Sequence, residues 1–282
     1  MSFLQNRPQA KPKVTYVQFA GKNNPKFPNG NYFFIALFGK NVGEKFAVTN
    51  DAINTMDLAP LPKTAVSFWC ENVPDGQNKY IEWLYTGDND PANELGMTLP
   101  TKQQSEQRIQ EIWNGKAFAV KQPQTNWFLP VLTVKKQGKG YDLATIEPMV
   151  LIVSESLMTK IVTSAQSPNI TDTDNPSMYG RVFSLSKDTT QEDKGKYYDA
   201  TVLLKVFDET DLPNIETTAA ELHEQSFEGI NRLYQTVNGG EYNGDIVRAY
   251  ITALTGMSWE AFVNKYNVFP NAKLEVVETT GW

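Results

Sequence analysis

Trp127 to Ile146 reads WFLPVLTVKKQGKGYDLATI, and this run predicts a β-hairpin. Apolar residues fill the first arm, the polar turn KKQGKG follows, and a second arm begins at Tyr141. Gly138 and Gly140 can adopt the positive φ that tight hairpin turns require. We therefore expect paired strands at 127–135 and 141–146.

The same pattern returns downstream of this hairpin. Strands are expected at Val182–Lys187 and 197–207, on either side of a charged turn at 188–196. Between the two hairpins, Ser154 can cap a helix to Ala165, because Leu157, Ile161 and Val162 recur at helical spacing. We predict that both hairpins belong to one curved antiparallel sheet.

The rest of the chain divides into strands first and helices last. Further strands are expected at 14–19, 32–38, 45–49, 65–70 and 80–85, with a short helix at 105–113. Three helices follow residue 208. The first has a capping box at Thr218-Ala219-Ala220-Glu221, and the second runs from Asp245 to about Thr255 and is stopped by Gly256. The third starts at Ser258 and buries Trp259, Phe262 and Tyr266.

Strands grouped before helices favour an α+β fold, mainly antiparallel, with a C-terminal helical module. An OB-like Greek-key barrel and a β-sandwich both suit short strands joined by tight turns. The expected organisation is a flexible basic arm at 1–12, a β-rich core at 13–207 and an acidic helical module at 208–282. The core is one domain, or two sub-domains with a break near 86–126.

Charge is distributed unevenly along the chain, whose net charge is −6. Residues 1–50 hold seven Lys and Arg against one acid, whereas residues 208–282 hold four against twelve acids. A basic start and an acidic end suggest a polyanionic partner, with the acidic segment opposing its binding.

The sequence predicts a cytoplasmic protein, in the host cell if the chain is viral. No apolar run is long enough to span a membrane, and the polar N-terminus lacks the apolar core of a signal peptide. Cys70 is the single cysteine, so an internal disulfide cannot form.

Residues for catalysis are scarce. The one histidine, His223, lies in an acidic helical stretch and is expected to be a partly exposed helix residue, while Cys70 is expected to be a buried thiol. A Cys/His zinc site needs about four ligands, and the chain has two. We expect no cofactor, no metal and no enzymatic activity, although an enzyme with a carboxylate site stays a third possibility.

Aromatic and basic residues occur together on both hairpins. Single-stranded nucleic acid is bound by this combination, because bases stack on rings and cations follow the phosphates. The candidate binding residues are Trp127, Lys135, Lys136, Lys139, Tyr141, Arg181, Phe183, Lys187, Lys194, Lys196, Tyr197 and Tyr198.

The segments VLTVKKQGKGY, from Val131 to Tyr141, and GRVFSLSK, from Gly180 to Lys187, resemble the single-stranded-DNA-binding proteins of bacteriophages and related mobile elements. The resemblance covers about residues 127–207. It implies an OB-fold core that coats unpaired DNA or RNA without sequence preference. It also implies a docking site for a replication or recombination protein in the acidic region 208–282.

A structural or assembly protein of a virion or filament is the main alternative. Long polar loops and aromatic strands in an acidic chain fit that class equally well. A binder should carry a continuous basic and aromatic groove, whereas an assembly protein should carry flat complementary patches.

Overall fold

The computed structural model describes residues 15–21, 24–39, 60–70, 80–85, 90, 95, 101–104, 107, 118–171, 177–235 and 244–266. The chain divides into two compact units. The larger comprises Met1–Pro62 with Asn126–Gly229, and the smaller comprises Lys63–Thr125 with Ile230–Trp282. The predicted arm at 1–12, the strand at 45–49, most of the helix at 105–113 and the last sixteen residues lie outside the described residues.

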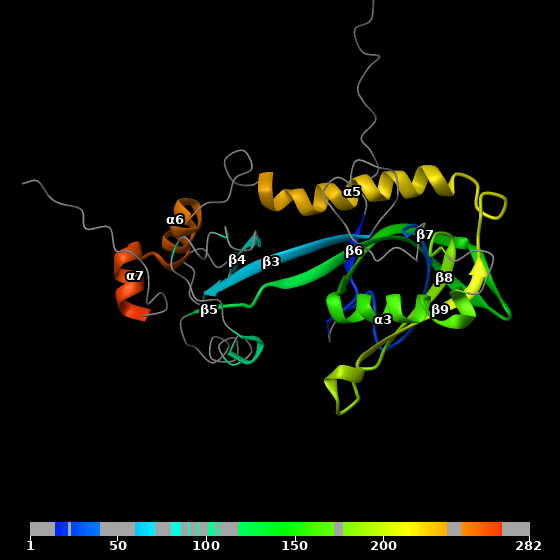
Figure 1. Ribbon diagram of the computed structural model, residues 1–282, viewed down its shortest axis with the longest axis horizontal. Helices are drawn as coiled ribbons and strands as arrows, with labels where there is room; N and C mark the ends of the chain where they lie inside the picture. Colours follow the sequence, from blue (N-terminus) through cyan, green and yellow to red (C-terminus); the bar gives the residue numbers. More distant parts are fainter. Residues whose placement is uncertain are drawn as a thin grey trace, which may run out of the picture. The chain divides into compact units, whose positions relative to one another are not determined.

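Strands precede most of the helices, so the fold is α+β, as predicted (Figure 1). The strands are β1 Tyr16–Gln18, β2 Gly30–Ala36, β3 Leu61–Cys70, β4 Tyr80–Leu84, β5 Phe118–Val120, β6 Gln124–Gln137, β7 Gly140–Ser154, β8 Arg181–Lys187 and β9 Tyr198–Val206. The helices are α3 Glu155–Ala165, α4 Pro168–Thr171, the 3₁₀ turn η3 Lys194–Lys196, α5 Ile215–Gln235, α6 Gly244–Thr255 and α7 Trp259–Tyr266.

The larger unit is built on a mixed, mostly antiparallel sheet with the order β1-β7-β6-β2-β8-β9. The two predicted hairpins, β6–β7 and β8–β9, do lie in one sheet, and β2 is inserted between them. β1 pairs with β7 in parallel. Along this path of described strands, β1 and β9 are the two ends and do not pair, so the sheet is open and a closed barrel is not shown.

Each strand of this sheet sends alternate side chains to opposite faces. On one face, Phe34, Leu129 and Leu151 form a buried core with the apolar side of α3. Ser154 caps α3 by accepting a hydrogen bond from the Leu157 amide, as the sequence predicted. α5 covers the other face (Figure 1). Val17 of β1 belongs to the core on the α3 side, so its neighbour Tyr16 points to the opposite face. There the Tyr16 hydroxyl donates a hydrogen bond to the carbonyl of Gln225 in α5.

The first C-terminal helix begins earlier than its sequence motif suggested. α5 starts at Ile215, directly after Asn214, whose φ of 69° ends the preceding turn. Thr218 therefore lies inside the helix, where its amide donates to the Asn214 carbonyl at 3.0 Å, and it is not the N-cap. His223 also differs from expectation, because at 8% exposure it is buried on the inner side of α5.

In the smaller unit, β3 pairs antiparallel with β4 and with β5. Trp83 of β4 is fully buried, and its indole nitrogen donates to Asp90 at 3.1 Å. α6 ends at Thr255, directly before Gly256, whose φ is 65°, and Ser258 caps α7, both as predicted. Phe262 is buried and Trp259 partly so. Within the described residues, no helix combines the length and apolar character needed to cross a membrane.

Candidate nucleic-acid interface

An open groove of about 910 Å³ lies where β2, β6 and β7 meet in the larger unit. The order of the strands explains its composition, because β2 pairs with β6 and β6 pairs with β7. Its lining combines aromatic, cationic and polar side chains, among them Phe27, Tyr32, Phe33, Thr133, Lys135, Lys136 and Glu147.

A β-bulge shapes this end of the sheet. The pairing of β6 with β7 jumps from Thr133↔Glu147 to Lys135↔Asp142, so β7 has extra residues at 143–146. Such an insertion bends the strand and disrupts the ladder locally. The residues at 144–146 form one wall of the groove. The Thr133 hydroxyl links β6 to this segment by accepting a hydrogen bond from the Glu147 amide at 3.2 Å.

Cations gather on the tip of the same hairpin. Lys135, Lys136 and Lys139 are all exposed, and the first two line the groove. The Lys136 ammonium lies 5.7 Å from the centre of the Phe33 ring. Glu147 is an exposed acid in the lining, so the groove is not uniformly positive.

Two neighbouring aromatic residues of β2, Tyr32 and Phe33, border the groove, and their side chains leave opposite faces of the sheet. Both are half-buried. Tyr32 donates its hydroxyl to the Pro28 carbonyl at 2.7 Å and packs edge-on against Phe27, with ring centres 5.0 Å apart. Burial raises the pKa of the Tyr32 hydroxyl above its usual value. Phe33 packs edge-on against Tyr141, with centres 6.0 Å apart.

Sequence reasoning missed Tyr32 and Phe33. Their aromatic run marked a strand, but only the pairing of β2 with β6 brings them beside the lysines. Because that pairing joins segments about a hundred residues apart, no local pattern could reveal it.

Three of the candidate residues point inward, which corrects their proposed role. Phe183 is fully buried and stacks on Phe34, with ring centres 5.5 Å apart. Arg181 is 1% exposed and donates to the carbonyls of Ser177, Leu203 and Leu204. Lys187 is 2% exposed and donates to two carbonyls. Both cations are already engaged inside the protein, and neither offers its charge to a phosphate.

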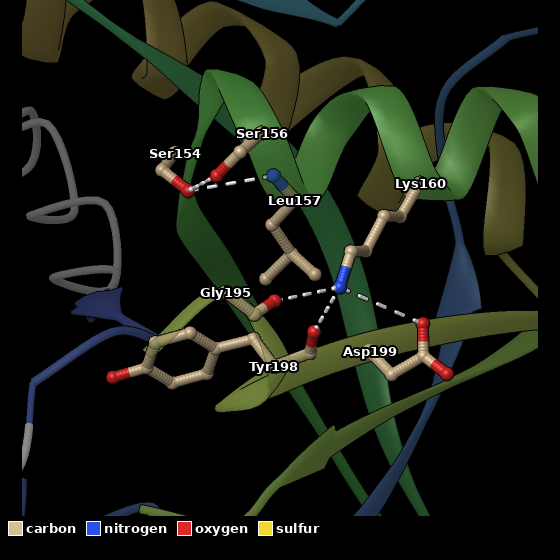
Figure 2. Close-up of polar contacts among 7 residues, drawn as sticks. All are labelled: Ser154, Ser156, Leu157, Lys160, Gly195, Tyr198 and Asp199. Atoms are coloured by element: carbon tan, nitrogen blue, oxygen red, sulfur yellow. Dashed lines mark hydrogen bonds and ion pairs between the residues drawn. The ribbon is translucent and has the colours of Figure 1, made fainter. Parts of the chain in front are cut away.

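The other candidate residues do not line the groove. Trp127 is half-buried against the core and donates to Glu155. Lys194 and Lys196 are exposed on η3, which Lys160 of α3 ties down by donating to the carbonyls of Gly195 and Tyr198 (Figure 2). Tyr197 packs edge-on against Tyr198, whose hydroxyl accepts from the Gly21 amide at 2.9 Å.

The structure therefore brings together Lys135, Lys136, Lys139 and Tyr141 on one hairpin, beside Tyr32 and Phe33. In the part of the chain that the structure describes, no three His, Cys, Asp or Glu side chains form a metal-binding group. Comparison with protein-family models, curated proteins and solved structures found no match. What this groove can bind is consequently argued from its geometry and chemistry.

Proposed function

We propose that this protein binds single-stranded nucleic acid through the groove between β2, β6 and β7. The observation that carries the proposal is that β2 and β6 place a half-buried ring and an exposed lysine together on each face of the sheet. The register puts Tyr32 on the same face as Lys135, and on the opposite face the Lys136 ammonium lies 5.7 Å from the centre of the Phe33 ring. All four residues border the groove. Lys139 extends the positive edge beyond the groove along the hairpin turn.

The proposed mode of binding needs both kinds of residue. Unpaired bases expose their faces and stack on aromatic rings, with about 1–3 kcal/mol gained per base. Lysines along the same path neutralise phosphates and release counterions. In a duplex the base faces are stacked on one another, so the rings favour single strands. OB-fold proteins bind in this way on a barrel, and here an open sheet would supply the same elements.

The test compares two lysine pairs by fluorescence anisotropy with labelled oligo-dT. We expect K135Q/K136Q to weaken binding about tenfold at low salt and to reduce the slope of log K against log salt by about 1.4, since each lost phosphate contact removes about 0.7. The matched control is K194Q/K196Q, which removes the same charge from η3, outside the groove.

Three outcomes separate the possibilities. If K194Q/K196Q binds with an affinity close to that of the wild type while K135Q/K136Q binds more weakly, the result supports binding in the groove. Equal losses from both lysine pairs would mean that net charge alone decides the affinity. Absence of wild-type binding to oligo-dT and to single-stranded RNA would end the proposal, and a preference for duplex DNA would contradict its stacking component.

A further inference from the structure

Lys187 is a lysine buried at the end of β8, with only 2% of its surface exposed. Its ammonium donates to the carbonyl of Gly21 at 2.5 Å and to that of Phe27 at 2.6 Å. Burial of an ammonium is costly unless hydrogen bonds compensate, and these two carbonyls provide that compensation. The burial also lowers the pKa of Lys187 from its usual value. The side chain thus ties β8 to the segment between β1 and β2.

That segment holds the groove's tyrosine in place. Phe27, whose carbonyl Lys187 binds, packs against the Tyr32 ring with centres 5.0 Å apart. The next residue, Pro28, accepts the Tyr32 hydroxyl at 2.7 Å. Contacts therefore run without a break from the Lys187 ammonium through Phe27 and Pro28 to the ring that lines the groove.

We infer that Lys187 is a positioning residue for nucleic-acid binding, which fixes the Tyr32 ring in the groove without touching the ligand. The inference rests on the proposed function. A base stacks with higher affinity on a ring whose orientation is already fixed, because ordering a side chain on binding costs free energy. A buried lysine suits this role, since one ammonium can donate to several carbonyls at once.

The experiment uses K187M in the full-length chain, with K194M as the control on an exposed lysine. We expect faster hydrogen exchange in residues 24–31 and at least about fivefold weaker binding to oligo-dT, the equivalent of about 1 kcal/mol from one weakened stack. The salt slope should match the wild type, because no phosphate contact is removed. K194M should leave exchange in 24–31 and affinity unchanged.

A second variant tests the same chain of contacts where the fold is not at risk. Y32F removes the bond to Pro28 and should also weaken binding without changing the salt slope, and its effect should be non-additive with K187M, because both act on one ring. If K187M does not fold, K187R and Y32F together test whether Lys187 positions Tyr32 for binding. K187R retains a cation that can donate to both carbonyls, so near-normal binding is expected.

Several results would overturn the inference. Folded K187M with wild-type affinity would show that Lys187 only stabilises the fold, and a salt slope reduced by about 0.7 would show a direct phosphate contact. If K187M does not fold, wild-type affinity in Y32F overturns it. A wild-type protein that binds no oligonucleotide overturns the proposed function itself, whereas wild-type binding that K187M retains overturns this inference alone.

Discussion

Gly180 stands where three strands meet. Its amide donates to Ala36 at the end of β2 at 2.8 Å, and its carbonyl accepts from Phe207 just beyond β9 at 2.7 Å. Its φ is 74°, and a Cβ at this position would lie 2.1 Å from the Phe207 carbonyl oxygen. The backbone conformation and the close approach both require glycine.

We expect G180A to lower the free energy of unfolding by more than about 2 kcal/mol, because left-handed backbone costs about 1–2 kcal/mol for an L-residue and the clash adds to it. The control is G138A in the hairpin turn, where φ is 59° but nothing lies within 4 Å of the added Cβ. The free energy of unfolding of G138A should fall only by the cost of the left-handed backbone, about 1 kcal/mol. Urea unfolding measures both, and equal losses would contradict the steric argument.

The neighbouring residue, Tyr179, makes stability depend on pH. Burial, followed by the charges of Glu216 and Glu209, raises the pKa of its hydroxyl from 10.0 to about 12. In the unfolded chain the hydroxyl loses its proton near pH 10. Between pH 10 and 12 the unfolded state therefore binds fewer protons than the folded state, and stability falls as the pH rises.

We expect the free energies of unfolding of the wild type and Y179F to differ by a constant amount below pH 10. Above it, the wild type should lose on the order of 1 kcal/mol relative to Y179F, since solvent screening reduces the full effect at this half-buried site. Urea unfolding from pH 8 to 12 provides the comparison, in which the other tyrosines and lysines cancel. A parallel decline of both proteins would contradict the assigned pKa.

At the scale of elements, the sequence predicted those whose signals are local. The β6–β7 hairpin followed from its glycine turn, α3 from the Ser154 cap, and the ends of α6 and α7 from Gly256 and Ser258. A cap at Thr218 would start α5 at residue 219, four residues after its actual start at Ile215, because a capping-box motif also fits the interior of a helix. The position of β2 between the hairpins was not predictable, since it depends on pairing between distant segments.

The same distinction explains the candidate site. Lysines beside a tight turn are exposed almost wherever the hairpin lies, and the candidate binding residues Lys135, Lys136 and Lys139 are exposed. β8 is central in the sheet, between β2 and β9, and is largely buried along its whole length. A strand of this kind lacks an outward face, so the candidate binding residues Arg181 and Lys187 are buried there.

On the scale of the whole molecule, the proposed binding must overcome a net charge of −6. α5 contributes exposed acids, among them Glu221 and Glu228, on the larger unit that also carries the groove. Ile215, Ala219 and Leu222 of the same helix are buried. Deleting the acidic segment would therefore expose the core, and neutralising individual acids is the sharper test of whether its charge opposes binding.

We expect E221Q/E228Q to bind oligo-dT more tightly at low salt, on the order of twofold, because two repulsive charges are removed from the unit that binds the phosphates. The gain should vanish above about 0.15 M salt, where the Debye length falls to about 8 Å and exposed charges at longer range are screened.

E221D/E228D retains both charges and should bind like the wild type, which separates charge from helix stability. Melting curves of both variants confirm that the fold is intact. If E221Q/E228Q binds no better at any salt concentration, the acidic helix does not compete with the ligand.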